Sequence, residues 1–230
     1  RLIEVDLPIK RISAHARREK SVRNGHISTL HIWWARRPLA ACRAVTCAAL
    51  WPDPADKNCP AEFRAIAADL MFAWARDNAA RGSADSAPTW TIIRQHTSAY
   101  ALCNHPATLR EALLDFLADF ADWQNSTVPE YIRVARSLTG GANWALSLEA
   151  LGTPRELGWP GFSQWDSELE TIRKAVAEHP APIVVDPFAG GGAFPFEAAR
   201  IGADSHAGDY NSLAATLNKS LLEYIPRTKD

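Results

Sequence analysis

Apolar residues recur at helical spacing in two stretches of the chain, residues 61–75 and residues 109–123. Apolar side chains three or four positions apart lie on one face of a helix, and that face is normally buried against other elements. We therefore expect both stretches to be core helices. Their apolar stripes are Phe63, Ile66, Leu70, Met71 and Trp74 in the first, and Leu113, Phe116, Leu117 and Phe120 in the second.

Capping signals predict the ends of further helices. Thr108 and Glu111 have the spacing of a capping box at a helix start. Pro129 favours the start of another helix over residues 130–138, and the pair Gly140-Gly141 predicts its end. A last helix is expected over residues 166–179, before the pattern changes.

A strand pattern replaces the helical pattern at residue 183. Residues 183–186, Ile-Val-Val-Asp, are a short run rich in β-branched residues between a proline and a glycine turn, which is typical of a buried strand. Residues 194–201 have the spacing of a helix packed on that strand. Residues 205–209 are expected to form a second short strand, followed by a helix over residues 211–224.

These elements predict an α/β protein with the first two strands of a Rossmann-like sheet and a largely α-helical N-terminal region. Residues 51–180 are too many for an ordinary connection, so we expect a structured helical insertion there. The chain then divides into a basic segment (residues 1–50), the helical insertion (residues 51–180) and the start of an incomplete Rossmann-like domain (residues 181–230).

The turn after the first strand is the candidate ligand site. Its three glycines, Gly190 to Gly192, lack a Cβ and let the backbone approach a ligand closely, and the carboxylate of Asp186 can hold polar groups of that ligand. A triphosphate loop requires Lys-Ser/Thr after the last glycine, where this chain has Ala193-Phe194. A dinucleotide fingerprint requires a third glycine at the position of Pro195. A different nucleotide-like cofactor is therefore expected.

Asp209 is the second candidate residue of this site. In a Rossmann-like sheet the acid at the end of the second strand accepts hydrogen bonds from the ribose hydroxyls of the ligand. Asp209 follows Asp186 by 23 residues, close to the separation of about 20 expected for this role. The alternative is that Asp209 caps the helix that begins at Asn211. Both roles are compatible.

Two stretches of the chain resemble a known family. Asp186 to Gly192, with the sequence Asp-Pro-Phe-Ala-Gly-Gly-Gly, resembles the first cofactor motif of S-adenosylmethionine-dependent DNA methyltransferases that methylate exocyclic amino groups. Residues 1–53 resemble the uncharacterised N-terminal domain of adenine-specific DNA methylases. The residues that carry this second likeness are Leu-Pro-Ile-Lys at 7–10 and His-Ile-Ser-Thr-Leu-His-Ile-Trp-Trp-Ala-Arg-Arg-Pro-Leu-Ala at 26–40.

The resemblance implies S-adenosylmethionine as cofactor and DNA adenine as substrate. In amino-methyltransferases a segment ahead of the first strand helps to hold the methionine end of the cofactor, and residues 33–38 are the candidate for it here. The cofactor-binding residues expected on this basis are Asp186, Pro187, Phe188, Ala189, Gly190, Gly192, Asp209, Tyr210, Trp34, Arg36, Arg37 and Pro38.

The charges of the chain are unevenly distributed. The formal net charge of −1 is the sum of +7 over residues 1–50, with ten Lys/Arg and three Asp/Glu, and −8 over the rest, with fifteen and twenty-three. A basic arm can neutralise DNA phosphates without choosing a sequence. Its expected DNA-binding residues are Lys10, Arg11, Arg17, Arg18, Lys20 and Arg23. The alternative is a solvated helix face, with Arg36-Arg37 flanking the next helix.

The two adjacent tryptophans, Trp33 and Trp34, allow two interpretations. Indole rings stack on nucleobases, and buried tryptophans are common in protein cores. We expect one of the pair in the core and the other in the wall of the site. The lone histidines His96, His105 and His179 are expected at the surface or at helix ends.

Cysteine spacing and hydropathy exclude other classes of protein. The four cysteines contain no Cys-x-x-Cys pair, so neither a disulfide framework nor a zinc ribbon is expected, and a reducing cytoplasm is the expected location. No apolar run approaches the roughly 20 residues that span a bilayer, and no signal peptide opens the sequence. We expect no membrane partner and no bound metal.

The sequence lacks a residue pattern that amine methylation requires. The amine is usually held by an Asn/Asp/Ser-Pro-Pro-aromatic loop, and this chain contains no Pro-Pro. We therefore expect the N-terminal part of a methyltransferase, whose partner is a C-terminal catalytic part or another subunit, and no catalysis by this chain alone. Two alternatives are a non-catalytic DNA-binding or scaffold module of a methylase or defence complex, and a dinucleotide-dependent oxidoreductase fragment.

Overall fold

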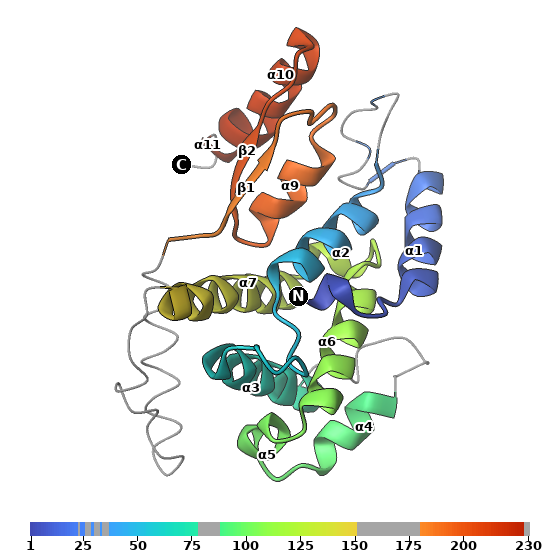
Figure 1. The fold of residues 1–230 in the computed structure, drawn as a ribbon. Coiled ribbons are helices and arrows are strands. Elements are labelled where there is room, and N and C mark those ends of the chain that lie inside the picture. Colours follow the sequence, from blue (N-terminus) through green and yellow to red (C-terminus); the bar gives the residue numbers. More distant parts are fainter. Residues whose placement is uncertain are drawn as a thin grey trace.

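A computed structural model of the chain describes residues 1–22, 24–25, 29, 33, 37–77, 88–150 and 180–227. The fold is mostly helical, with one two-stranded parallel sheet (Figure 1). The helices are η1 (Leu2–Glu4), α1 (Ile9–Ser21), α2 (Leu39–Leu50), α3 (Ala61–Asp77), α4 (Pro88–Gln95), α5 (Ala99–Cys103), α6 (Pro106–Phe120), η4 (Asn125–Thr127), α7 (Pro129–Ala150), α9 (Ala193–Arg200), α10 (Ser212–Lys219), the π-helical turn η6 (Ser220–Tyr224) and α11 (Ile225–Arg227). The strands are β1 (Ile183–Asp186) and β2 (Asp204–Ala207).

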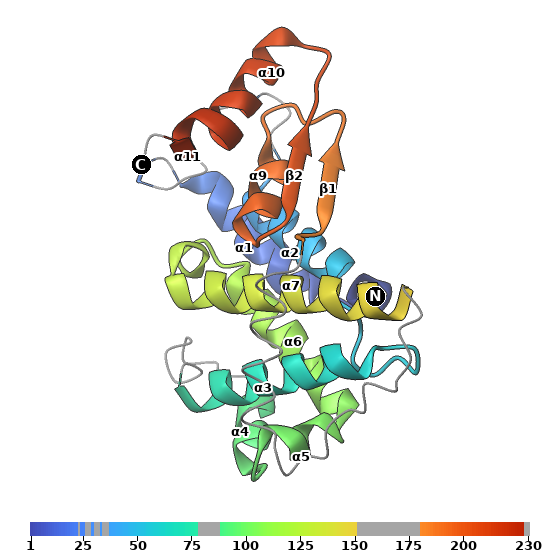
Figure 2. The same cartoon turned by 90° about the vertical axis from the view of Figure 1, so that its left-hand side faces the viewer.

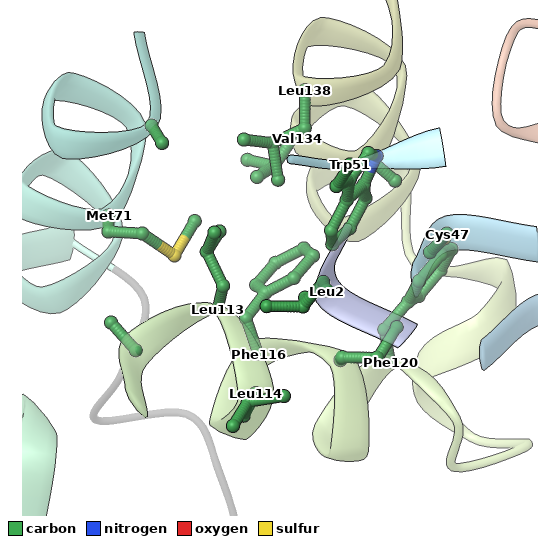
Figure 3. Packing of buried hydrophobic residues seen from close by; sticks show 14 of the residues in the cluster. Leu2, Cys47, Trp51, Met71, Leu113, Leu114, Phe116, Phe120, Val134 and Leu138 are labelled. Carbon is green, nitrogen blue, oxygen red and sulfur yellow. The ribbon is translucent and has the colours of Figure 1, made fainter. Parts of the chain in front are cut away.

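The largest core lies in the helical body formed by α3, α6 and α7. Most residues of both apolar stripes expected from the sequence lie in this core, and both stripes fall on helices, which confirms the two predicted helices. Figure 3 shows Met71 of the first stripe and Leu113, Phe116 and Phe120 of the second. Aromatic rings fill its centre: Trp74 and Tyr131 meet edge to face with their ring centroids 4.5 Å apart, and Phe120 stacks on Tyr131 at 5.8 Å. Large rings bury much apolar surface per residue, so these contacts make the helical body the main source of stability.

Helix α7 does not end at Gly140-Gly141, and this sequence-based prediction was wrong. The helix runs from Pro129 to Ala150 because the missing side chain of Gly141 lets α7 approach α3 closely. A Cβ at Gly141 would lie only 3.0 Å from Cδ1 of Ile66. Close packing therefore offsets the helix penalty of glycine, which is about 1 kcal/mol.

Two further helix predictions have different outcomes. Helix α6 begins at Pro106 with His105 as its N-cap, so Thr108 and Glu111 are the third and sixth residues of the helix and form no capping box. Proline is well suited to the first helical position because it lacks an N–H that would be unsatisfied there. The helix expected over residues 166–179 lies outside the described residues.

The two strands and α9 form a β-α-β unit that stands on the helical body (Figures 1 and 2). Strands β1 and β2 pair in parallel from Ile183 with Asp204 to Asp186 with Ala207. One face of the sheet packs on α9, and the opposite side of α9 packs on α2. These elements confirm an α/β protein with a two-stranded parallel sheet and the expected order of strand, helix and strand.

Helix α1 is joined to the start of α2 by one buried carboxylate. The side chain of Glu19 accepts hydrogen bonds from the backbone N–H of Leu39 at 2.9 Å and of Ala40 at 2.8 Å. These N–H groups have no partner within their own helix, because they belong to its first turn. Glu19 is fully buried, so the bond fixes α1 against the N-terminus of α2.

Candidate functional site

The loop between β1 and α9 is closed by backbone hydrogen bonds to the segment after β2. The Ala189 N–H donates to the carbonyl of Gly208 at 2.9 Å, and the Gly208 N–H donates to the carbonyl of Asp186 at 2.8 Å. Within the loop, the Gly192 N–H donates to the carbonyl of Ala189 at 2.8 Å. The carboxyl ends of both strands and the loop therefore form one connected structure, as a ligand site at this edge of a parallel sheet requires.

Two glycines of this loop have left-handed backbone conformations. Gly190 has φ of +53° and Gly192, the N-cap of α9, has φ of +77°. Both also contact a side chain closely. A Cβ at Gly190 would lie 3.0 Å from Nε1 of Trp33, and a Cβ at Gly192 would overlap Oδ1 of Asn218. Glycine is thus required at both positions by backbone conformation and by space.

Asp209 holds the loop directly. Its Oδ2 accepts the Gly190 N–H at 2.7 Å, and its Oδ1 accepts the Asn211 N–H at 2.8 Å. These two bonds, from Asn211 and then from Gly190, lower the pKa of the Asp209 carboxyl because they stabilise its charged form. Each carboxylate oxygen has further lone-pair capacity, so both can still accept a hydroxyl of a ligand.

The alternative role expected for Asp209 is filled by another residue. Asn211 is the N-cap of α10, and its side chain accepts the Leu213 N–H at 2.9 Å. Asp209 orients this cap through the Asn211 N–H but does not cap the helix itself. The acid is therefore placed between the glycine loop and the start of α10.

The remaining residues of the predicted motif lie at the end of the strands. Asp186 closes β1, and its Oδ1 accepts the Phe188 N–H at 3.1 Å. The ring of Phe188 is 83% exposed and that of Tyr210 is fully exposed. Pro187 lies next to Gly208, where a Cβ would be 3.7 Å from the Pro187 Cα. The two acids, two aromatic rings and the glycines are thus gathered at one edge of the sheet.

Asn218 is a functional candidate that the sequence analysis missed. It lies on α10 and is only 3% exposed. Its amide nitrogen donates to the carbonyl of Gly190 at 3.0 Å and to that of Ala214 at 2.8 Å, while its Oδ1 accepts no hydrogen bond. The sequence pattern that could have indicated Asn218 is a polar residue four positions after Ala214, on the buried side of an amphipathic helix.

The segment expected to hold the methionine end is described only in part. Trp34 and Arg36 lie outside the described residues. Arg37 is exposed and Pro38 is the N-cap of α2, and no bond joins either of them to the glycine loop within the described structure. Trp33 is 8% exposed and lies against Gly190, so this one residue is both buried and part of the wall of the loop.

Most residues of the predicted basic arm lie on α1, and their environments differ. Arg11 faces α6, where it pairs with Asp115 at 2.5 Å and with Asp119 at 2.7 Å. A phosphate contact by Arg11 would require both ion pairs to break. The exposed cations of α1 are Lys10, Arg17, Arg18 and Lys20, whereas Arg23 lies outside the described residues.

A buried ion pair joins the glycine-loop unit to the helical region. The Arg43 guanidinium donates through Nε to Oε2 of Glu197 at 2.9 Å and through Nη2 to Oε1 at 3.2 Å, and neither side chain is exposed. The third nitrogen of Arg43 donates to the carbonyl of Phe120 at 2.6 Å. Arg43 is the one charged residue of α2, among mostly apolar neighbours, which is the sequence signal of a buried, paired charge.

Cysteines and histidines supply no second site among the described residues. All four cysteines are free, and no group of three or more potential metal ligands occurs in this part of the chain. The rings of His96 and His105 lie 4.8 Å apart, at the end of α4 and the start of α6, as expected for helix-end residues. Partial burial, and then the neighbouring His105, lower the pKa of His96. Of the described helices, none is long and apolar enough to cross a membrane.

Comparison with known proteins gives one match. Residues 6–72 match a family model described as a protein of unknown function, DUF1156. No curated protein and no solved structure matches the chain. The matched stretch begins before α1 and ends within α3, so it includes Glu19, Trp33 and Arg43 but none of the glycine loop.

Proposed function

We propose that this chain is the N-terminal part of an adenine-specific DNA amino-methyltransferase, and that it binds S-adenosylmethionine at the loop from Asp186 to Gly192. The methyl transfer itself is assigned to residues outside this chain, because the chain contains no Pro-Pro loop for the target amine. The proposal rests on the chemistry of the loop, on its position at the carboxyl end of a parallel strand, and on the resemblance of its sequence.

The main support for the proposal is that backbone N–H groups of the loop are hydrogen-bonded within the protein. The N–H groups of Phe188, Ala189, Gly190 and Gly192 all donate to acceptors within the protein. A phosphate-binding loop keeps such groups free to surround an anion. This loop therefore favours a nucleoside ligand without phosphates, which S-adenosylmethionine is, over nucleotides and dinucleotides.

The protein's own residues fit such a ligand. Asp209 and Asp186 provide acceptors for hydroxyl and ammonium groups, and the exposed rings of Phe188 and Tyr210 provide apolar faces for a purine. The bound cofactor supplies the methyl group on its sulfonium. The chain's residues hold the nucleoside and position it, while Gly190 keeps the backbone close to the ligand because it has no Cβ.

Exposed apolar residues on the sheet support a further partner. Ile183 and Val185 on β1 are 68% and 64% exposed, although parallel sheets are normally covered on both faces. In Figure 2 these strands lie in front of α9, and no described helix covers the opposite face. A two-stranded sheet is also marginal by itself. We assign this face to the catalytic part of the enzyme or to a partner subunit.

The exposed cations of α1 support DNA as the substrate. Lysine and arginine side chains that neutralise phosphates release counterions, so DNA affinity falls steeply with salt. We expect replacement of Lys10, Arg17 and Lys20 by alanine to flatten the salt dependence of binding to a DNA duplex, measured by fluorescence anisotropy. Arg11→Gln is the matched control, because Arg11 is already paired with carboxylates and its loss should leave the slope unchanged.

Calorimetric titration with S-adenosylhomocysteine tests the cofactor. We expect weak binding by this chain, and its loss in Asp186→Ala and Gly190→Leu, whereas Lys57→Ala, in the exposed turn before α3, should bind as the parent does. Absence of binding, or binding unchanged by both site variants, would refute the methyltransferase proposal. Steep salt dependence of DNA binding without cofactor binding would instead favour the non-catalytic module, and binding of a nicotinamide dinucleotide that requires Asp209 would favour the oxidoreductase.

A further inference from the structure

Two contacts connect the stretch that matches the family of unknown function to the glycine-loop unit, and a third contact within the stretch supports the first of them. The first is the pair of Arg43 on α2 with Glu197 on α9, in which the guanidinium and the carboxylate share two hydrogen bonds. A planar, bidentate pair fixes direction as well as distance. Because both side chains are fully buried, the pair fixes the rotation of α9 about its own axis against α2.

The position of Glu197 makes this rotation matter for the loop. Helix α9 has only eight residues, and its N-cap, Gly192, is the last glycine of the loop. At 1.5 Å per residue, Glu197 lies about 8 Å along the helix from Gly192. A short, rigid helix transmits its orientation to its first residue, so the ion pair at Glu197 also sets the direction in which the loop leaves Gly192.

The second contact comes from Trp33. The indole ring of Trp33 lies so close to Gly190 that a Cβ added at Gly190 would be 3.0 Å from the indole Nε1. The ring therefore closes one side of the loop. The third contact steadies the first: Glu19 binds the first two N–H groups of α2 and so holds the helix that carries Arg43. All three side chains belong to residues 6–72.

We propose that residues 6–72 hold the glycine loop in position. Arg43 positions α9 through Glu197, and Trp33 packs against Gly190 from the side. This gives the stretch of unknown function a role inside the ligand site, in addition to any contact with DNA. The inference deepens the proposed function and rests on it for the identity of the ligand. The positioning itself is a property of the protein without ligand.

The positioning role of a buried ion pair can be tested separately from its contribution to the free energy of unfolding. Replacing both charges by apolar side chains of similar volume often leaves a protein as stable as before, because the cost of desolvating the charges is removed. Apolar contacts have no preferred direction. Oε1 of Glu197 also accepts a hydrogen bond from Nη1 of Arg200 at 2.8 Å, and Arg200 keeps its bond to the carbonyl of Ser126 when Glu197 is replaced. The variant Arg43→Met/Glu197→Leu should therefore keep the fold while α9 loses its fixed rotation.

Amide hydrogen exchange of the ligand-free chain, followed by NMR with ¹⁵N-glycine, tests the proposal. We expect the amides of Gly190 and Gly192 to exchange at least tenfold faster in the double variant, relative to the amides of Gly140 and Gly141 in α7. The matched control is Arg110→Met/Asp53→Leu, which removes a bidentate pair in the helical body. This control should leave loop exchange unchanged. Trp33→Leu provides an independent variant should the double variant fail to fold.

Affinity for S-adenosylhomocysteine provides the second measurement. We expect a loss of at least fivefold in Arg43→Met/Glu197→Leu and none in the control. Loop exchange that rises no more in the double variant, or in Trp33→Leu, than in the control would overturn the positioning role. Absence of cofactor binding by the parent chain would refute the proposed function alone, because the exchange measurement still decides whether residues 6–72 position the loop.

Discussion

Gly192→Ala tests whether the glycine loop is held by Asn218. The substitution adds one methyl group at a residue with φ of +77°, and this methyl group would overlap Oδ1 of Asn218. The amide cannot move away freely, because its nitrogen is bonded to the carbonyls of Gly190 and Ala214. The side chain is also short and almost fully buried.

The expected loss of stability has two parts. The left-handed conformation costs an L-residue roughly 1–2 kcal/mol. Displacing the Asn218 amide breaks two hydrogen bonds, and each contributes about 1 kcal/mol net. We therefore expect Gly192→Ala to lower the free energy of unfolding by roughly 3–4 kcal/mol. Gly25→Ala should cost only roughly 1–2 kcal/mol, because Gly25 has a similar φ of +75° but no atom within 4 Å of its Cβ position.

Equilibrium unfolding in urea measures both variants, and a double-mutant cycle isolates the contact. In Gly192→Ala/Asn218→Ala the added methyl group meets no amide, so the double variant should be little less stable than Asn218→Ala alone, apart from the backbone strain. A Gly192→Ala variant no less stable than Gly25→Ala would refute the reasoning. So would additive free energies in the cycle, because they would mean that the two residues do not interact.

Three further predictions concern other parts of the molecule. The folded protein lowers the pKa of Asp209, so the stabilising bond from the Gly190 N–H to this carboxylate is fully present above the ordinary aspartate pKa of about 3.9. The bond is lost as the pH falls through the lower pKa of the folded state. An NMR titration of the Gly190 amide with a midpoint at or above about 3.9 would contradict this. In a thermal unfolding assay, Glu19→Gln should lower the free energy of unfolding by about 2 kcal/mol, because it weakens two charge-assisted hydrogen bonds to the first turn of α2. Lys20→Ala, at an exposed position, should change the free energy of unfolding little in the same assay. Burial raises the pKa of three thiols, to about 12 for two of them, so a thiol reagent at pH 8 should label them only after denaturation; the three are Cys42, Cys47 and Cys59. The partly exposed Cys103 can react in the native protein, so rapid native labelling of more than one thiol would contradict the buried positions.

Local patterns along the chain predicted the elements that depend on near neighbours. The apolar stripe at Phe63 to Trp74 has one period only, 3.6, so it specifies a helix and its buried face whatever packs on it. The run Ile183 to Asp186 followed by glycines likewise specifies a strand and a turn, because β-branched residues favour extended backbone and only glycine readily takes positive φ. The separation of Asp186 and Asp209 placed the second acid at the same edge of the sheet, where it bonds to Gly190.

Tertiary packing decided the features that depend on residues distant in sequence. Gly140-Gly141 ends a helix by local preference, yet the approach of Ile66 makes glycine the residue that lets α7 continue. The sequence predicts Arg11 as a phosphate ligand because it is a cation in a basic segment. In the folded protein it binds two carboxylates of α6, Asp115 and Asp119, which are 104 and 108 residues away in the sequence.

The site itself shows the same division. Its glycines and acids were evident in the sequence, because they lie within one turn of the strand ends. Asn218 and the pair of Arg43 with Glu197 were not, because each contacts the loop unit only after α2, α9 and α10 have packed together. The sequence predicted one of Trp33 and Trp34 in the wall of the site, and the packing places Trp33 against Gly190. Backbone preferences determined where the glycine loop forms in this protein, and burial between distant helices decided how that loop is held.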